Sequence, residues 1–480
     1  MVLLILLAGC SQNSPTGQGA DVLDPGNPVA LTLWHYYVGD NKISLEKLIA
    51  EFNQSVGIEQ GVIIEPVGMG SVRELEALIT DSAKGVINSP PMPDIFSTYP
   101  DKAKELDQLV ELCDLNNYFS HDERGEYVED FISDGLFQDG RLLLLPIVKS
   151  TELLYLNATS WEEFAKDTAY ELEDLATWEG ILDIARSYYK WTDGANPDTL
   201  WDGCAFFGYD SVANYILAGN RQLGVEIIDG DKEEAHIDRK VLRKLFDIYV
   251  QGIGFGYFDA IGKFRADDIK ARDLIAYVGS SSSAAYFPTW VEEDNQQKPI
   301  EFIALPYPAF EGSQEYVIQQ GAGMGVVKST PQKEAGAALF MKWFTSKEQN
   351  IEFSITTGYI PVKRETFDDH QFKEAIKELD RGRQVEKNVG QVYEIVLEQV
   401  LSSNTYAAKA FDKSYDLRSI LQAKLMDVGQ SVKGQVVGLK EQYDSEEDIL
   451  DNLDLDLIYD HWLKELIEDL QAVGISVQVN

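Results

Sequence analysis

Through the first hundred residues, the pattern of apolar and polar positions predicts strands and helices in alternation. Residues 30–34 form a short apolar run that predicts a buried strand, and apolar residues follow at helical spacing across 45–52. Residues 62–67 predict a second strand, and a capping box at 71–74 opens a second helix. Residues 94–96 predict a third strand. This order predicts a parallel sheet with crossover helices.

The same alternation returns further along the chain. The predicted strands are 142–148, 153–156, 225–228, 274–278 and 302–305. The predicted helices are 178–189 and 239–250, with another that starts at Pro331 and a capping box at 346–349. From about residue 366 onward we expect helices only. A chain of 480 residues is too long for one core, so two α/β lobes are expected.

The loops that follow the strands carry the candidate binding residues. In open α/β sheets, ligands bind outside the carboxyl ends of the strands. These loops combine aromatic rings, hydroxyls and glycines, which suit the faces and the many hydroxyl groups of a sugar. The candidates are Trp34, His35, Tyr36, Met69, Ser71, Tyr99, Lys149, Ser150, Glu152, Asp210, Ser280, Ser281, Ser282, Gly323 and Tyr359.

Several of these candidates have a purely structural interpretation as well. Trp34 and Tyr36 also fit as core aromatics at a strand end, and Ser71 is a helix cap. Lys149 and Glu152 also fit as an ion pair at a crossover between lobes. Asp210 precedes Ser211 and also fits as a helix N-cap. The serine run at 280–283 also fits a flexible loop.

The N-terminal sequence is typical of a signal for export and lipid attachment, and the alternative is an ordinary buried strand followed by a structural cysteine. The apolar run 2–7 leads into Leu7-Ala8-Gly9-Cys10, in which small residues precede a cysteine. Residues 11–28 are rich in Ser, Gly, Asn, Gln and Pro, as in a flexible tether. Lys or Arg is missing before Lys42, so we expect the true signal to start upstream. The apolar run is too short to span a bilayer, which needs about 20 apolar residues.

Charge and cysteine content narrow the possible functions. The 80 acidic residues outnumber the 41 basic ones and give a net charge of −39, which disfavours nucleic acid as a partner. Five histidines are scattered without metal-ligand spacing. Besides Cys10, only Cys113 and Cys204 remain. A disulfide between them and two free thiols are both compatible with the sequence.

The chain resembles the family-1, carbohydrate-type solute-binding proteins of ABC importers. The resemblance spans roughly residues 30–420. Leu7-Ala8-Gly9-Cys10 matches the bacterial lipoprotein box of such receptors. The other matching segments are 34–36, 93–96, 146–157, 177–179, 279–285 and 357–361. Several are closest to glycerol-3-phosphate-binding proteins, which have a Trp-His start, a Ser-rich loop and a Thr-Gly-Tyr-x-Pro turn.

The resemblance implies a type II periplasmic-binding-protein fold. Ser150, Ser280–Ser283, Gly323 and Tyr359 would then line the site. That family also uses an arginine from its C-terminal helices on the phosphate. Here the matching place is near Lys409, and Arg418 lies further on. This departure puts a phosphorylated ligand in doubt.

These inferences together predict a lipid-anchored, monomeric receptor outside the cytoplasm. It would capture a sugar, an oligosaccharide or a glycerol phosphate compound without a cofactor and deliver it to permease subunits. The expected parts are a signal peptide at 1–9, a tether at 10–28, one lobe at 29–148 and 306–345, and another at 149–305 and 346–480. The expected crossovers lie near Lys149 and at 305–308. A secreted carbohydrate-active enzyme and a surface adhesin are the alternatives.

Overall fold

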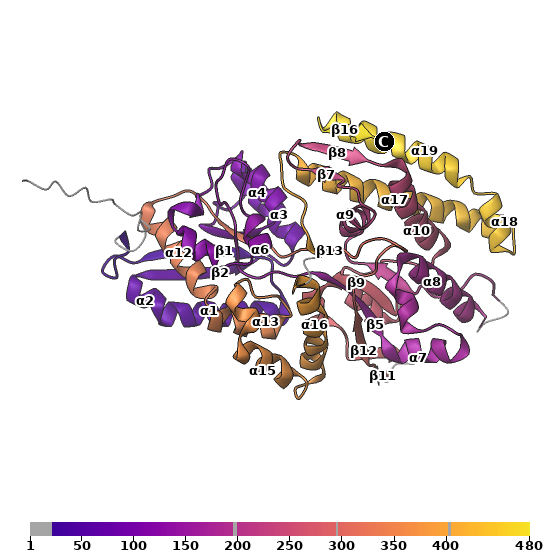
Figure 1. Ribbon diagram of the computed structural model, residues 1–480, viewed down its shortest axis with the longest axis horizontal. Helices are drawn as coiled ribbons and strands as arrows, with labels where there is room; N and C mark the ends of the chain where they lie inside the picture. Colours follow the sequence, from indigo (N-terminus) through magenta and orange to yellow (C-terminus); the bar gives the residue numbers. More distant parts are fainter. Residues whose placement is uncertain (1–21, 195–198, 294–295, 402–404) are drawn as a thin grey trace, which may run out of the picture.

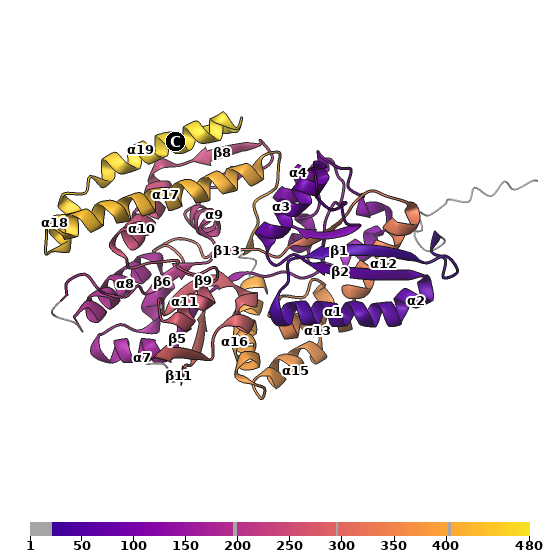
Figure 2. The same ribbon diagram turned by 180° about the vertical axis from the view of Figure 1, so that it is seen from behind.

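The computed structural model describes residues 22–194, 199–293, 296–401 and 405–480. They form two α/β lobes side by side along the long axis of the molecule (Figure 1), and the view from behind shows the same division (Figure 2). The signal segment, Cys10 and most of the tether lie outside the described residues. No helix within the described ranges is long and apolar enough to cross a membrane.

The first lobe is built on a five-stranded sheet in the order β2-β1-β3-β14-β4. Its strands are β1 (Val29–His35), β2 (Val62–Gly68), β3 (Ile95–Thr98), β4 (Leu145–Pro146) and β14 (Gly323–Val326). β1 runs parallel to β2 and β3, as the strand–helix pattern predicts, whereas β14 is antiparallel to β3 and β4. Leu31 and Leu33 are fully buried on one face of β1, and Trp34 packs in a separate cluster with Leu75 and Phe96.

Helices surround this sheet. They are α1 (Gly39–Gln54), α2 (Val56–Gln60), α3 (Val72–Ala83), α4 (Pro100–Asp107), η2 (Leu115–Asn117), α5 (His121–Gly125), α6 (Glu129–Ser133), α12 (Pro331–Phe344), α13 (Lys347–Thr357), α14 (Arg364–Asp368) and α15 (His370–Leu379). α13 packs on α1. The sequence assigned residues 346 onward to the second lobe, but the apolar face of α13 is buried against the first lobe.

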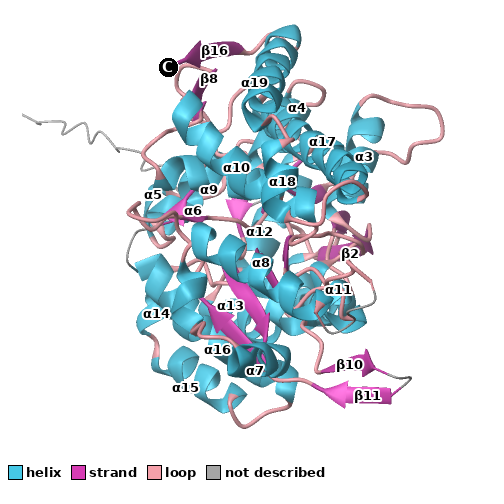
Figure 3. Ribbon diagram, turned by 90° about the vertical axis from the view of Figure 1, so that its right-hand side faces the viewer, coloured by secondary structure: helices cyan, strands magenta, loops and turns pink. Residues whose placement is uncertain are grey.

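The second lobe contains a four-stranded sheet in the order β12-β5-β9-β6. Its strands are β5 (Glu152–Asn157), β6 (Phe207–Tyr209), β9 (Ala276–Ser280) and β12 (Phe302–Leu305). The helices are α7 (Ala158–Asp167), η3 (Leu172–Ala176), α8 (Trp178–Asp193), α9 (Val212–Gln222), α10 (Arg239–Phe255), α11 (Arg265–Ala271), η4 (Ser281–Tyr286), α16 (Gln384–Leu401), α17 (Ser414–Lys440), α18 (Glu446–Asp451) and α19 (Leu455–Ala472). A hairpin of β10 (Trp290–Glu293) and β11 (Gln296–Pro299) stands at one edge (Figure 3).

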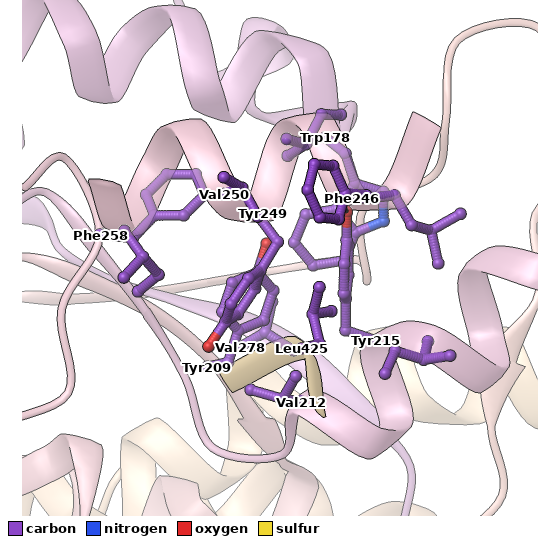
Figure 4. Close-up of a cluster of buried hydrophobic side chains, with 14 of the residues drawn as sticks. Trp178, Tyr209, Val212, Tyr215, Phe246, Tyr249, Val250, Phe258, Val278 and Leu425 are labelled. Carbon is purple, nitrogen blue, oxygen red and sulfur yellow. Dashed lines mark hydrogen bonds between the residues drawn. The ribbon is translucent and has the colours of Figure 1, made fainter. Parts of the chain in front are cut away.

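An aromatic core holds the helices of the second lobe to its sheet. Trp178 is fully buried, with its ring 4.9 Å from that of Tyr215 and 5.5 Å from that of Tyr209. Tyr249 of α10 and Leu425 of α17 join the same cluster (Figure 4). Because α17 contributes to this core, the C-terminal region is an integral layer of the second lobe.

The C-terminal region is not entirely helical, contrary to the sequence expectation. β16 (Ser476–Val479) pairs in parallel with β8 (Glu234–Ile237), which also pairs with β7 (Ile228–Asp229). β15 (Thr405–Tyr406) pairs with β13 (Val317–Ile318). These strands are too short and too polar to give an apolar periodicity, so only their pairing partners reveal them.

Adjacent segments connect the lobes through main-chain hydrogen bonds. The N–H of Ser150 donates to the carbonyl of Gln320 at 2.9 Å, and the N–H of Gln320 donates back at 2.7 Å. Lys149 exchanges the same pair of bonds with Ile360. The sequence placed the second crossover at 305–308. In the structure residues 309–314 still hydrogen-bond to second-lobe elements, so the crossing comes later, at Gln319–Gly321.

Candidate ligand site between the two lobes

The lobes meet along a seam that brings several predicted residues together. On the first lobe the seam is formed by the loops after β1 and β3 and by α3 and α4. On the second it is formed by the start of β5, by η4 and by the first turns of α17. The hydroxyl of Tyr286 on η4 donates to the carbonyl of Val38 at 2.9 Å. The side-chain amide of Gln138 likewise donates to the carbonyl of Gly230.

Three predicted tyrosines gather at the seam. Tyr359 lies close enough to Tyr36 of the first lobe and to Ser282 on η4 for both side chains to lower the pKa of its phenol. Tyr99 lies near Tyr359, and burial raises the pKa of all three phenols above 10. All three are therefore neutral at pH 7 and offer both an aromatic face and a hydroxyl group. This combination suits the C–H faces and hydroxyl groups of a sugar.

Carboxyls from the first lobe meet basic and phenolic groups of α17. The Nη1 atom of Arg418 lies 3.1 Å from Oδ2 of Asp101, and the hydroxyl of Tyr415 donates to Oε2 of Glu76 at 3.2 Å. Lys102 lies 4.5 Å from the centre of the Tyr415 ring. Burial, followed by the charge of Asp101, raises the pKa of Glu76 to about 7. The guanidinium of Arg418 is therefore already neutralised by a carboxylate.

Glu152 is the most deeply buried acid at the seam. It is 1% exposed, and its Oε1 atom accepts from Nδ2 of Asn214 at 2.9 Å and from Nε2 of Gln320 at 3.5 Å. Its Oε2 atom is also buried but has no hydrogen-bond partner among the described residues. Burial raises the pKa of Glu152 to about 8, which the charge of Asp210 also favours.

Asp210 follows β6 and faces the same region. It is accessible to solvent, and its carboxyl approaches Gly279, where a Cβ atom would lie 2.8 Å from Oδ2. The protein surrounding Asp210 raises its pKa to about 6, and the nearby charge of Arg265 opposes the rise. Ser211, not Asp210, caps α9. Asp210 is therefore available to contact a solute.

Other predicted residues are engaged elsewhere in the fold. Trp34 packs in the first-lobe core, and the Ser71 hydroxyl caps α3 by accepting from the N–H of Glu74 and donates to its carboxylate. Lys149 is buried against Asp134, with 2.5 Å between Nζ and Oδ2, and so holds the hinge. Lys409 is half-exposed and pairs with Asp231.

The remaining candidates line the strand ends without a distinctive contact. His35 is fully buried, and burial lowers its pKa to about 4, so it is neutral at pH 7. Met69 is half-buried against the cluster that contains Trp34. Ser150 is a hinge residue, and Gly323 lies in β14 beside Leu144. Ser280 and Ser281 open η4, where the Ser281 hydroxyl is buried without a partner among the described residues.

Sequence reasoning missed Arg418, Asp101, Glu76 and Asn214 as residues of the seam. Arg418 was noted only as lying beyond Lys409. The amphipathic pattern of α3 and α4 could have pointed to two of them, because it places the charged residues Glu76 and Asp101 at buried positions in the helices. A charge at a buried helical position usually has a partner in the fold.

Two hollows on the surface lie away from the seam. One, of about 430 Å³, is lined by Arg186, Lys190 and Glu446 between α8 and α18. The other, of about 470 Å³, is lined by residues of α10 and α19, including Arg243 and Asp456. Arg186 and Lys190 pair with Glu446, and Arg243 pairs with Asp456. Ion pairs of charged side chains do not resemble a site for a sugar.

Among the described residues, one group of side chains is spaced closely enough to bind a metal ion. Asp229, Glu234 and His236 lie within ligand spacing on β7 and β8. The Nζ atom of Lys232 lies 2.9 Å from Oδ2 of Asp229, so a lysine ammonium already pairs with one carboxylate of this group. Cys113 is buried and Cys204 is exposed, and both are free thiols.

Solved structures with the same fold cover almost the whole chain. An ABC substrate-binding protein of Listeria monocytogenes in complex with cycloalternan has a TM-score of 0.66 at 13% identity, covering 94% of this chain and 100% of that one. UgpB of Mycobacterium tuberculosis in complex with glycerophosphocholine has a TM-score of 0.64 at 16% identity, covering 93% and 100%. The cyclic alpha-maltosyl-1,6-maltose binding protein of Arthrobacter globiformis has a TM-score of 0.63 at 16% identity, covering 92% and 100%.

A comparison with curated protein sequences finds no match. A family profile described as bacterial extracellular solute-binding protein matches residues 47–378, which is more than half of the chain. The two-lobed α/β fold with its hydrogen-bonded hinge agrees with that match. The protein belongs to the bacterial extracellular solute-binding protein family.

Proposed function

We propose that this protein is the receptor of an ABC importer and captures a carbohydrate-type solute between its two lobes. The supporting observation is the gathering of Tyr36, Tyr99 and Tyr359 beside Ser282 at the seam. Aromatic faces and neutral hydrogen-bonding groups from both lobes suit a sugar, because the lobes can close on either side of a ring. Permease subunits would then receive the solute from the closed form.

A phosphorylated solute is disfavoured by the charges at the seam. Arg418 is the arginine that could meet a phosphate, but it pairs with Asp101. Glu76 and Glu152 lie close enough to Arg418 for their pKa values to respond to its charge. A phosphate would bring further negative charge beside these acids. The proposed solute is therefore not an anion.

We further propose that a lipid on Cys10 holds the receptor at the outer face of the cell membrane. The Leu-Ala-Gly-Cys sequence and the polar segment after it support this proposal. Two acyl chains give stable anchoring, whereas one gives only marginal binding. Expression of the full precursor in bacteria, with and without Cys10→Ala, tests the anchor. We expect the variant to lose labelling by an alkyne fatty acid and to move from the membrane to the soluble fraction.

A ligand screen tests the proposed function. Thermal unfolding should be recorded with mono- and oligosaccharides and with their phosphorylated forms. We expect neutral sugars to raise the melting temperature and Tyr359→Ala to abolish the rise. Tyr443→Ala, at a partly buried position after α17 and away from the seam, is the matched control. The proposal would be contradicted if only phosphorylated sugars raised the melting temperature, or if no carbohydrate raised it. Turnover of a glycan by the pure protein would favour an enzyme.

A further inference from the structure

An imidazole and two carboxylates converge on the small sheet that holds the C-terminus to the second lobe (Figure 1). Glu234 and His236 are two positions apart on β8, so their side chains leave the strand on the same face. Asp229 on β7 is paired directly with Glu234 and shares that face. One ligand atom from each of the three lies within 4.8 Å of the others, so a single ion can contact all three.

The distances within the group leave room for an ion at its open side. The Nε2 atom of His236 lies 2.7 Å from Oε1 of Glu234 and 3.9 Å from Oδ2 of Asp229. All three side chains are partly buried, so they are held in place by the sheet and are still reached from solvent.

The protein anchors the other oxygen of each carboxylate. The Oδ1 atom of Asp229 accepts from two main-chain N–H groups of the following turn, at 3.0 and 3.1 Å. Gln478 on β16, which is paired with His236, donates to Oε2 of Glu234 at 3.3 Å. These bonds turn the remaining oxygens toward the imidazole, and bonds of this kind orient ligands at metal sites.

Lys232 marks the position of a cation in this group. Its Nζ atom lies 2.9 Å from Oδ2 of Asp229 and 3.9 Å from Oε1 of Glu234. The same two oxygens therefore already attract a positive charge. The Lys232 side chain is 62% exposed, so its ammonium can move into water at little cost and leave this position to another cation.

The ligand types select the kind of ion. Mg²⁺ and Ca²⁺ prefer shells made of oxygen alone, whereas imidazole nitrogen suits Zn²⁺ and its neighbours in the first transition row. Three protein ligands of mixed N and O type leave a further position for water, as in open zinc sites. A protonated lysine has no lone pair to offer, so Lys232 competes with the ion and does not bind it.

We propose that Asp229, Glu234 and His236 bind a divalent transition-metal ion such as Zn²⁺, which displaces the ammonium of Lys232. This inference is independent of the proposed function, because the group lies on β7 and β8 and not among the seam tyrosines. The ion would join β7 to β8 and fix the turn between them.

That turn also contacts the first lobe. The side-chain amide of Gln138 donates to the carbonyl of Gly230, which lies directly after Asp229. A bound ion would therefore hold a point at which the two lobes meet.

Titration calorimetry of the purified protein, treated with EDTA and then freed of it, tests the inference at pH 7.5. All titrations use a Cys204→Ser background, because an exposed thiol binds zinc by itself. We expect one Zn²⁺ ion to bind with a dissociation constant of about 10 μM. Mg²⁺ and Ca²⁺ should each bind more weakly by about tenfold or more.

Substitutions within the group separate a metal site from a set of surface ion pairs. We expect His236→Gln and Glu234→Gln each to weaken Zn²⁺ binding by about tenfold or more. Lys232→Met should strengthen it by about fivefold, because a competing charge is removed. His461→Ala, at an exposed histidine on α19, is the control and should leave the affinity unchanged.

The melting temperature of each variant without metal shows whether it folds as the unmodified protein does. Zn²⁺ binding no tighter than Mg²⁺ binding would overturn the inference, as would an unchanged Zn²⁺ affinity in folded His236→Gln. An unchanged affinity in Lys232→Met would show that the ion does not take the place of the ammonium. These outcomes leave the proposed function untouched.

Discussion

Arg418 on α17 and Asp101 on α4 form an ion pair across the two lobes, with 3.1 Å between Nη1 and Oδ2. They are 317 positions apart in the sequence. Asp101 is buried and Arg418 is partly exposed, so the pair is shielded from solvent on one side. Helix α17 thus contacts the first lobe directly.

Loss of this ion pair should favour the open form. We expect Arg418→Gln to increase the radius of gyration of the ligand-free protein in small-angle X-ray scattering. Solute affinity should fall about tenfold, which corresponds to about 1.4 kcal/mol. Arg381→Gln, an exposed arginine paired with Glu378, is the control. Identical scattering curves for Arg418→Gln and the unmodified protein would rule out a role for the pair in closure.

Stability should fall as pH rises from 5 to 8. Burial raises the pKa of Glu76 from 4.5 to about 7, so the folded state holds this proton while the unfolded chain releases it. The free energy of unfolding therefore decreases with pH between these values, by about 1.4 kcal/mol for each unit of pKa difference at most. Below pH 4.5 both states are protonated and the effect vanishes.

Glu76→Gln checks the origin of this dependence. The variant has no proton to lose, so its melting temperature should decline less between pH 5 and 8 than that of the unmodified protein. Glu468→Gln should retain the original slope, because that residue is exposed. A parallel decline in Glu76→Gln would show that other groups cause it.

The aromatic core of the second lobe should be sensitive to truncation at Trp178. Its indole is fully buried and contacts rings of β6, α9 and the segment after β12. We expect Trp178→Ala to reduce the free energy of unfolding by about 3–5 kcal/mol, because a large cavity is left. Trp290→Ala, at a half-buried position in the β10–β11 hairpin, should cost much less. Urea denaturation followed by circular dichroism provides the comparison.

Gly321 at the hinge should tolerate no side chain. Its φ of +103° is unfavourable for other residues, and a Cβ atom would lie 2.8 Å from Cα of Lys149. We expect Gly321→Ala to lower the melting temperature and to weaken solute binding. Gly434→Ala has open space around it in the exposed part of α17, so it should be neutral or slightly stabilising. Equal behaviour of the two variants would contradict the steric argument.

Much of the fold follows from local pattern, whereas the seam does not. β1, β2, α8 and α10 have strong apolar periodicity, and the structure has them close to their predicted bounds. The pairing of β16 with β8 joins segments more than 200 residues apart, and neither strand is apolar enough to stand out alone. The second crossover was misplaced because the proline-containing segment after β12 resembles a linker, although residues 309–314 hydrogen-bond to the second lobe.

The seam depends on contacts between distant residues. Ser282 and Glu152 were chosen because each follows or begins a predicted strand, and Tyr359 was chosen for a Thr-Gly-Tyr-x-Pro turn that resembles the family pattern. Neither rule needs tertiary information. Arg418 and Asn214 lie on helices, where a polar residue ordinarily faces solvent. Asp101, the partner of Arg418, becomes known only when the lobes are placed against each other. Glu152, the partner of Asn214, becomes known only from the tertiary fold of the second lobe.

The reciprocal hydrogen bonds between Ser150 and Gln320 restrict how the lobes can move. Two connecting segments joined in this way behave as a narrow ribbon, which bends easily across its flat face and resists twisting and sideways shear. The lobes therefore have one soft direction of motion instead of several. If the lobes close on a solute as proposed, this hinge would return Tyr36 and Glu152 to the same register at each closure and so preserve selectivity over repeated cycles.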